Sequence, residues 1–126
     1  MEIRQLDHLV LTVENIETTC RFYETVLGMK VIEFAGGRKA LKFGQQKINL
    51  HEQGKEFEPK AERPTPGSAD LCLLTDVPIL EIITHIKSCQ VEVIAGPVER
   101  TGAEGPILSV YLRDPDNNLL EIANLI

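Results

Sequence analysis

The sequence has 126 residues, with 13 Lys and Arg against 19 Asp and Glu, a formal net charge of −6, and 43% apolar residues. These values are typical of a soluble globular domain, and they exclude a disordered tail, a collagen-like repeat and a coiled coil. A nucleic-acid-binding module is not expected, because phosphate binding needs a cationic surface and this chain is anionic on average.

The N-terminus shows no basic stretch followed by an apolar core, so no secretory signal is expected. The apolar runs are far shorter than the ~18 residues needed to cross a bilayer, which argues against a membrane partner. The three cysteines, Cys20, Cys72 and Cys89, are an odd number without C-x-x-C spacing and are typical of buried thiols in a reducing compartment. We therefore expect a cytoplasmic protein.

The first half of the chain predicts one helix among four strands. Leu6–Val13 is short and rich in Leu and Val, as expected of a buried strand. Asn15 can cap a helix with apolar residues at helical spacing, and Gly28 ends it. Gly36-Gly37 predicts a hairpin turn. The remaining strands expected here are Met29–Ala35, Arg38–Phe43 and Lys47–His51.

The second half predicts the same order after a loop, Gln53–Gly67, that is rich in proline and charge. Asp76 is expected to cap a helix over residues 78–88. Asp114-Pro115-Asp116-Asn117-Asn118 is a strong turn signal before the last strand. The strands expected are Ala69–Thr75, Gln90–Ala95, Ile107–Arg113 and Leu119–Leu125, with a Gly/Pro loop at Gly96–Pro106.

The chain therefore reads as two repeats of strand, helix, strand, strand, strand: an α+β fold with a module at 1–53, a loop at 53–67 and a module at 68–126. Aligning the opening strands places His8 over Asp70, and aligning the closing strands places His51 over Glu121. A half of ~60 residues buries too little surface alone. The halves are expected to pack together as one domain, 1–126, or to pair with halves of another chain.

Three polar residues conflict with their apolar neighbours. Glu121 lies within Leu-Leu-Glu-Ile-Ala, His51 closes Ile-Asn-Leu-His, and His8 lies in Leu-Asp-His-Leu-Val. A carboxylate in such a strand is costly unless it is paired or bound to a metal. Strand alternation lets all three residues point to one face of a sheet, and a curved sheet would bring them to one point.

Two imidazoles and a carboxylate bind Mn, Fe, Co, Ni or Zn and leave positions open for a Lewis-acid site, whereas calcium prefers oxygen ligands. Asp70 is a further oxygen donor, as a fourth ligand or a partner of the ligands. The alternative is that each strand histidine is a hydrogen-bonded core or rim residue. Under that alternative, Glu121 is paired with Arg113 or Lys47.

Substrate clues are weaker. Arg100 could hold an anionic group and Tyr111 could line a pocket, because loops and strand ends carry such contacts. Further cations, Lys55, Lys60 and Arg63, lie in the long loop beside Glu58 and Glu62. That mixture of charges favours a solvated loop.

Four phrases, DHLVLTV, RFYETVLGMKV, INLHEQ and YLRDPDNNLLEIAN, resemble the vicinal oxygen chelate superfamily. This superfamily includes glyoxalase I, methylmalonyl-CoA epimerase, fosfomycin-resistance enzymes, extradiol dioxygenases and metal-free bleomycin-binding proteins. The resemblance covers essentially the whole chain. The longer stretches NLHEQGKEFEPKAERPTPGSADLCL and GPVERTGAEGPILSVYLRDPD resemble the subgroup called glyoxalase domain-containing protein 5.

The resemblance implies a cupped mixed sheet built from paired βαβββ modules, with helices outside and a divalent transition metal (Mn, Ni, Zn, Co or Fe) inside. His8 matches the superfamily's first-strand histidine ligand, and Glu121 its last-strand glutamate. His51 is matched to the fourth-strand ligand, where glyoxalase I has a glutamate. Asp70 matches the fifth-strand position, where glyoxalase I and the fosfomycin enzymes have a histidine.

These matches predict a metal-dependent lyase or isomerase of the lactoylglutathione lyase type, acting on a small oxygenated substrate. A base must lie within hydrogen-bond reach of the proton that moves. The residue expected to act as this base is Glu121, with Asp70 as the weaker candidate. The alternatives are a metal-free protein that binds a small molecule and an Fe(II) oxygenase. A homodimer is expected, because the superfamily commonly builds sites from modules of two chains.

Overall fold

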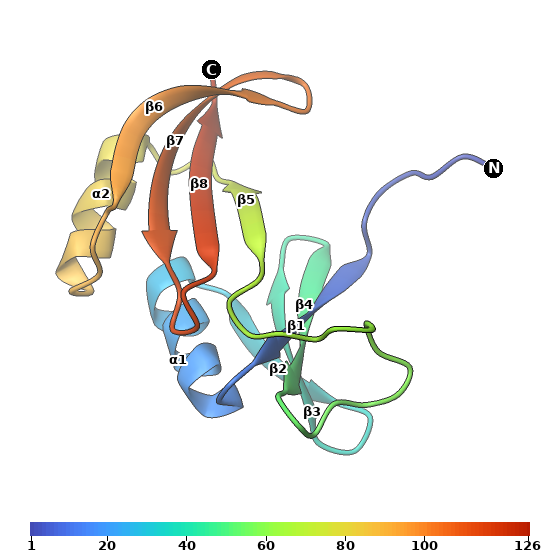
Figure 1. Ribbon diagram of the computed structural model, residues 1–126. Coiled ribbons are helices and arrows are strands. Elements are labelled where there is room, and N and C mark those ends of the chain that lie inside the picture. Colours follow the sequence, from blue (N-terminus) through green and yellow to red (C-terminus); the bar gives the residue numbers. More distant parts are fainter. The chain divides into compact units, whose positions relative to one another are not determined.

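The structure is a computed structural model that describes all residues, Met1–Ile126. It divides into two compact units, unit 1 (Met1–Pro66) and unit 2 (Gly67–Ile126) (Figure 1). Each unit contains one strand-helix-strand-strand-strand repeat with a four-stranded mixed sheet, so the predicted α+β fold with two βαβββ modules is confirmed. Neither helix has the length and hydropathy needed to cross a membrane.

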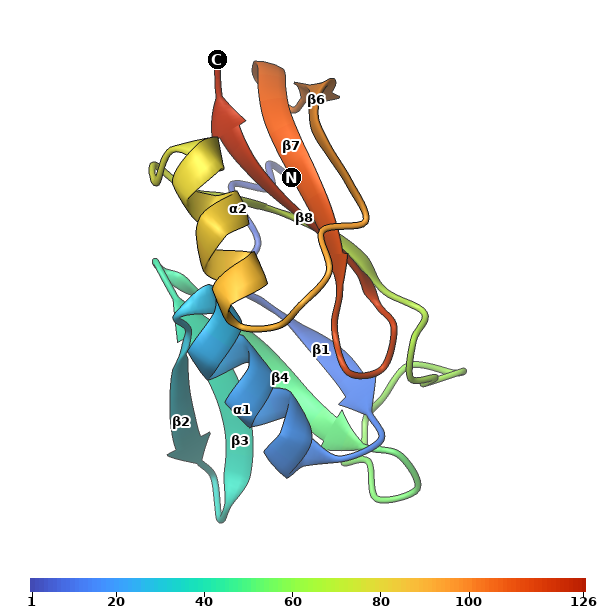
Figure 2. The same cartoon turned by 90° about the vertical axis from the view of Figure 1, so that its left-hand side faces the viewer.

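Unit 1 contains one helix and four strands: β1 (His8–Val13), α1 (Ile16–Leu27), β2 (Lys30–Phe34), β3 (Arg38–Phe43) and β4 (Gln46–Glu52). The strand order is β1-β4-β3-β2, with β1 parallel to β4 and the other pairs antiparallel. Helix α1 packs against one face of this sheet (Figure 2). The core between them is formed by Leu11, Val13, Tyr23, Val26, Met29, Leu41, Ile48 and Leu50.

The other face of this sheet has no helix of unit 1 on it, and we call it the helix-free face. Side chains alternate along each strand, so every second residue belongs to this face. Its centre is Ala40 of β3 opposite Asn49 of β4. Its members are His8, Val10 and Thr12 of β1; Lys30, Ile32 and Phe34 of β2; Arg38, Ala40 and Lys42 of β3; and Lys47, Asn49 and His51 of β4.

The two ends of α1 are as predicted. The side chain of Asn15 accepts a hydrogen bond from the Thr18 backbone N–H at 2.9 Å, which satisfies one of the free donors of the first turn. Gly28 ends the helix with φ 67°, a left-handed conformation that glycine adopts without a steric penalty. Helix and strand are therefore joined by a turn that the sequence itself specifies.

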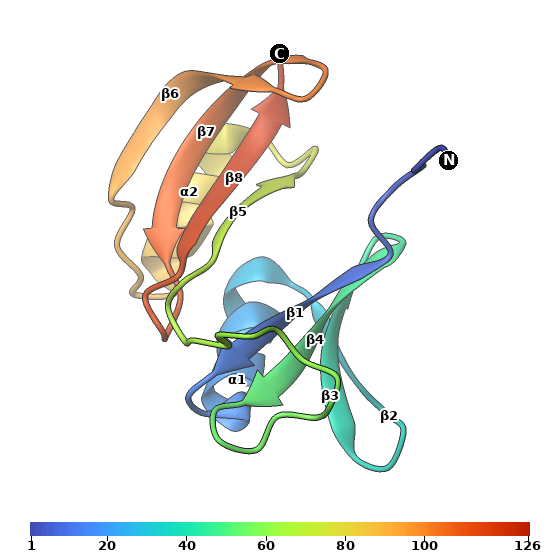
Figure 3. The same ribbon diagram turned by 45° about the vertical axis from the view of Figure 1, so that its right-hand side comes forward.

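Unit 2 contains β5 (Asp70–Leu74), α2 (Ile79–Ser88), β6 (Ala95–Gly102), β7 (Gly105–Arg113) and β8 (Leu119–Leu125). The strand order is β5-β8-β7-β6, with β5 parallel to β8 (Figure 3). The core of this unit is formed by Ile79, Ile82, Ile86, Ile107, Val110, Leu112, Leu120 and Ile122.

Two predicted boundaries in unit 2 were wrong. Asp76 is not the helix cap: α2 begins at Ile79, so Pro78 takes the N-cap position without a side-chain hydrogen bond. The strand expected at Gln90–Ala95 begins only at Ala95 and continues to Gly102, where a loop was expected. Strand β6 tolerates Pro97 because it is an edge strand, and its register shifts between Ala95 and Val98.

The predicted turn at Asp114–Asn118 is confirmed, and it ties β5 to the rest of unit 2. Asp114 accepts hydrogen bonds from the backbone N–H groups of Asp116 and Asn118 and from the Asn118 side-chain amide. The Asn118 amide oxygen in turn accepts from the Ala69 N–H at 2.8 Å. Asn118 is fully buried, so its two hydrogen bonds with Asp114 are protected from water.

Replacing Asn118 by alanine is therefore expected to lower the free energy of unfolding by about 2–4 kcal/mol, because it removes the amide that donates to the buried Asp114 carboxylate and accepts from the Ala69 backbone N–H. Chemical denaturation of the wild type and the variant measures this loss. The matched control is Asn117→Gly, since Asn117 is exposed and has φ 66°, which glycine accommodates. A loss for Asn118→Ala no larger than that of the control would contradict this account.

Candidate functional site

The strand register shows which polar residues of the two repeats are equivalent. In unit 2, Glu121 pairs with Cys72, two residues beyond Asp70. In unit 1, the residue paired two positions beyond His8 is Asn49, opposite Val10. The structural counterpart of Glu121 is thus Asn49. The expected equivalence of His51 and Glu121 was wrong by two residues.

The register also separates the two histidines of the predicted ligand set. His8 pairs with Lys47, whereas His51 pairs with Thr12, four positions further along the same two strands. At about 3.3 Å per residue this offset corresponds to about 13 Å along the sheet. Unit 1 therefore does not bring His8 and His51 together. No group of three or more His, Cys, Asp or Glu side chains is arranged to hold a metal ion.

His8 is nevertheless oriented like a ligand. Its imidazole is exposed, and Nδ1 lies 2.8 Å from Oδ2 of Asp7. The hydrogen bond from His8 lowers the pKa of the Asp7 carboxyl, so Asp7 remains a carboxylate and accepts the hydrogen bond of the Nδ1–H group. Metal-binding histidines commonly donate one ring N–H to a carboxylate in this way and present the other nitrogen to the ion. His8 thus fits the role of a metal ligand.

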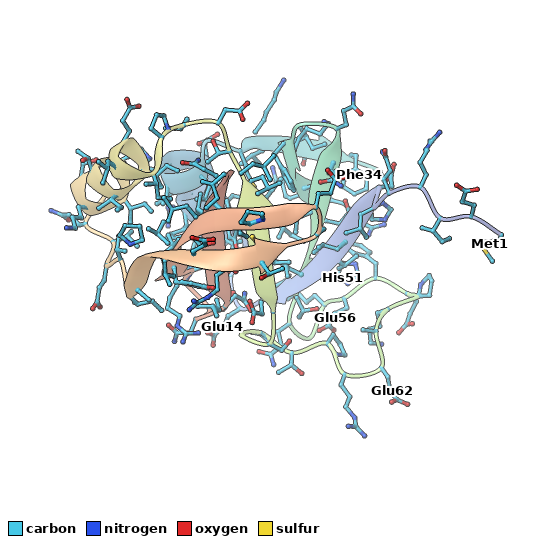
Figure 4. All side chains as sticks on the ribbon, turned by 90° about the horizontal axis from the view of Figure 1, so that it is seen from above. Met1, Glu14, Phe34, His51, Glu56 and Glu62 are labelled. Carbon is cyan, nitrogen blue, oxygen red and sulfur yellow. The ribbon has the colours of Figure 1, made fainter.

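His51 has a different environment. It is 3% exposed, its Nε2 lies 3.3 Å from Nη2 of Arg38, and its ring meets Phe57 edge-on at 5.6 Å. Burial lowers the pKa of His51, and the Arg38 charge lowers it further, while Glu56 opposes them (Figure 4). Because a guanidinium only donates, Nε2 of this neutral imidazole is the acceptor. A metal at Nε2 would displace Arg38 and lie beside its charge, so His51 fits the ligand role poorly.

Asn49 was missed in the sequence. It is 6% exposed, and its side-chain oxygen Oδ1 is buried without a hydrogen-bond partner. Most buried polar atoms in proteins are paired, so an unpaired amide oxygen marks a place where a ligand donor would be accommodated. The sequence Asn-Leu-His favours the histidine as the candidate ligand, because imidazole is the more common metal donor. Only the pairing of β1 with β4 shows that Asn49 lies on the same face as His8, opposite Val10.

Arg38 and Lys47 share one aromatic ring on the helix-free face. The Arg38 guanidinium carbon lies 5.2 Å from the centre of the Phe34 ring and 4.5 Å from that of Phe57. The Lys47 Nζ atom lies 3.9 Å from the centre of the Phe34 ring. With His51, these residues form what we call the cationic–aromatic cluster: Phe34, Arg38, Lys47, His51 and Phe57.

In unit 2, Glu121 is half-buried and has polar neighbours but no cation. The Ser109 hydroxyl donates to its Oε2 atom, and the Cys72 thiol is a second hydrogen-bonding partner. Burial raises the pKa of the Cys72 thiol, and the Glu121 charge raises it further, so the thiol stays protonated. Of the two cations predicted as its partners, Arg113 donates instead to the Asn117 carbonyl, and Lys47 lies over the Phe34 ring of unit 1.

The weaker candidates contact one another or their neighbours. Arg100 of β6 donates from Nε to the Tyr111 hydroxyl at 3.1 Å, which orients both side chains. Asp70 is exposed at the start of β5. The loop lysines form local ion pairs, Lys55 with Glu52 and Lys60 with Glu58, in keeping with a solvated loop. These pairs leave the loop cations without an evident role in binding.

Comparisons with known proteins agree with this architecture. The family model of the Glyoxalase/Bleomycin resistance protein/Dioxygenase superfamily matches residues 5–122. The chain belongs to this superfamily. It is 58% identical to Virulence protein STM3117 of Salmonella typhimurium over 100% of this chain and 88% of that protein. It is 55% identical to Glyoxalase domain-containing protein RDO1 of Mycosarcoma maydis over 98% of this chain and 70% of that protein. The narrower resemblance to glyoxalase domain-containing protein 5 stays a prediction.

Solved structures show the same fold. The crystal structure of STM3117 has a TM-score of 0.99 over 100% of both chains. Lactoylglutathione lyase from Agrobacterium tumefaciens is 19% identical, with a TM-score of 0.75 over 98% of this chain and 96% of its own. The fosfomycin resistance protein FosX of Listeria monocytogenes, complexed with Mn(II) and 1S,2S-dihydroxypropylphosphonic acid, is 22% identical, with a TM-score of 0.67 over 97% and 90% of the two chains.

The environment of His51 predicts how stability depends on pH. Its pKa in the folded protein is below the ordinary value of 6.5, so the unfolded chain takes up the proton first. The free energy of unfolding should therefore fall as the pH drops below about 6.5 and level off once the folded histidine is also protonated. Denaturant titrations between about pH 7.5 and about pH 5 measure this slope.

His51→Gln should flatten that slope, because it removes the group that the folded protein keeps neutral. Thr84→Ala is the control, since Thr84 is exposed on α2 and carries no titratable group, so this change should leave the slope as it is in the wild type. Equal slopes for the wild type and His51→Gln would show that His51 is not held neutral by its surroundings.

Proposed function

We propose that this protein is a metal-dependent lyase or isomerase of the lactoylglutathione lyase type that acts on a small oxygenated substrate. The observation that supports this most strongly is Glu121, a half-buried carboxylate with hydrogen-bond donors but no cation. An unpaired carboxylate inside a protein is costly unless it binds a cation or a substrate proton. The resemblance to the superfamily also matches Glu121 to the last-strand glutamate ligand.

The donors proposed for the metal are the residues that match the superfamily's ligands, His8 and Glu121, with Asp70 as a further oxygen donor. The set of nitrogen and carboxylate ligands suits Mn, Fe, Co, Ni or Zn. When bound, such an ion supplies a Lewis acid that polarises a substrate carbonyl or hydroxyl. His51 is left out of this set because Arg38 occupies its Nε2 atom.

Glu121 is also the residue proposed to accept or return the substrate proton. The Ser109 hydroxyl and the protonated Cys72 thiol donate to the carboxylate and fix its orientation, so that it does not rotate away from the substrate. The side chains of Leu120 and Ile122 lie on the opposite face of β8 and are buried in the core, which holds β8 in register. Glu121 is thereby held in one place by both its neighbours and its strand.

Members of the superfamily bind small molecules and commonly form dimers. We propose the same here: a small-molecule substrate, a homodimer, and a cytoplasmic location. The complex of the Listeria protein with Mn(II) supports a divalent metal in this fold, and the likeness to a lactoylglutathione lyase supports lyase or isomerase chemistry.

The test is the metal content of the tag-free protein, stripped with chelator and reloaded with Mn, Ni, Zn or Fe(II). Wild type is expected to retain about one equivalent per chain, and Glu121→Gln and His8→Gln are each expected to lose most of it, because each removes a ligand. His51→Gln should retain the metal, since its Nε2 atom is bound to Arg38. Elemental analysis after dialysis measures all four proteins.

Glu99→Gln is the matched control, because Glu99 is an exposed carboxylate of the same unit, on the edge strand β6. Loss of metal in the control as well would mean that retention reflects overall charge. Failure of the wild type to hold any metal would overturn the proposal and favour a metal-free binding protein. Oxygen uptake by the Fe(II)-loaded protein would instead favour the oxygenase.

A further inference from the structure

We infer that the helix-free face of unit 1 holds the carboxylate group of a small anionic ligand between Arg38 and Lys47. This inference deepens the proposed function, and it rests on that function only in taking the ligand to be the substrate. The cationic–aromatic cluster defined above is what recognises the anion. No residue of the cluster belongs to the proposed metal donors.

The first observation is that neither cation forms a salt bridge. Neither Arg38 nor Lys47 has a carboxylate within the 4.0 Å of a salt bridge, whereas the neighbouring Lys39, on the opposite face of β3, pairs with Glu33 at 3.8 Å. The same face also carries Lys30 and Lys42, so it gathers four cations in a chain whose net charge is −6. Their isolation is therefore a property of this face.

The second observation is that Arg38 is held in place but not satisfied. Its guanidinium lies against Phe34 and Phe57, and Nη2 donates to His51. Its Nε atom is buried and has no acceptor. Aromatic faces and a neutral imidazole orient a guanidinium without neutralising it, so an anion at its accessible edge is strongly favoured.

The third observation is the spacing of the cluster. Arg38 and Lys47 both lie over the Phe34 ring, 5.2 Å and 3.9 Å from its centre, so the two charges are at most about 9 Å apart. A compact carboxylate-bearing molecule spans such a distance. The Lys47 charge helps to lower the pKa of the Asp7 carboxyl, but Asp7 forms its ion pair with His8, and Glu56 accepts from the Gly54 N–H.

The remaining side chains favour a carboxylate on a short carbon skeleton. A planar guanidinium matches the two oxygens of a carboxylate. Val10, Ile32, Phe34 and Phe57 offer apolar surface for carbon atoms on the same face. The unpaired Oδ1 atom of Asn49 accepts from a ligand hydroxyl or a similar donor. The ligand class is thus a small carboxylic acid that carries a polar group.

The experiment measures the binding of succinate, a compact dicarboxylate, to the chelator-treated metal-free protein by calorimetry or NMR titration. Succinamide, the neutral diamide of the same skeleton, is the comparison ligand. Succinate is expected to bind at least about tenfold more tightly than succinamide, and more weakly as salt is raised. Arg38→Gln and Lys47→Gln are each expected to weaken succinate binding about tenfold.

Lys39→Gln is the matched control, because it removes a cation from the same strand on the opposite face, and it should bind succinate like the wild type. If Arg38→Gln does not fold, Arg38→Lys keeps the charge and loses the planar fork, and an intermediate affinity is expected. Equal binding of succinate and succinamide, or equal affinities of wild type and Lys47→Gln, would overturn the inference, as would tighter binding of inorganic phosphate.

The two proposals fail separately. Succinate binding that depends on Arg38 in a protein that never retains metal would overturn the proposed function and leave the anion site standing. Retention of one metal by a protein that does not distinguish succinate from succinamide would do the reverse.

Discussion

The pairing of the first and last strands of each repeat determines which side chains can act together. Both β1·β4 and β5·β8 are parallel, and each forms the middle-to-edge pair of its sheet. Because side chains alternate strictly, a shift by one residue would bury the polar set against the helix, and the apolar core forbids it. The helices and the cores built from Leu50 and Leu120 thus fix the register, and the register in turn places Asn49 opposite Val10 and Glu121 opposite Cys72.

The same alternation explains how much the sequence could predict. Helix α1, its two caps and the closing turn were readable because each depends on local residues, Asn15, Gly28 and Asp114. The equivalence of His51 and Glu121 was misjudged because a slip of two residues preserves alternation: Ile48 and Leu50 match Leu120 and Ile122 as well as any other pair. Nothing in the local sequence penalises such a slip, since it keeps apolar residues inward. Only the partner strand distinguishes the two alignments.

A site residue could be predicted from the sequence where its polarity differs from that of its immediate neighbours. It could not be predicted where its role depends on contacts with residues distant in the sequence. Glu121 stands out within an apolar strand and needed no structure to be noticed. Arg38 and Lys47 look like ordinary surface cations, because the sequence does not show that no carboxylate reaches them. Phe57 lies in a loop of mixed charge and becomes meaningful only through its contacts with His51 and Arg38. Unsatisfied charge is a property of the fold, and the composition of the chain gives no sign of it.

Each unit therefore keeps one kind of charge without its complement: cations on the helix-free face of unit 1, and the Glu121 carboxylate in unit 2. Leaving a partly buried charge unpaired lowers stability by an amount that a single apolar replacement would recover. The surrounding residues increase this cost, since Phe34 and Phe57 pack against the Arg38 guanidinium, while desolvation raises the pKa of the Cys72 thiol and lowers that of the His51 imidazole. A neutral imidazole and a protonated thiol can orient a neighbouring charge but cannot cancel it. Such an arrangement lowers the stability of the free protein and favours binding, because a bound ligand or ion supplies the opposite charge.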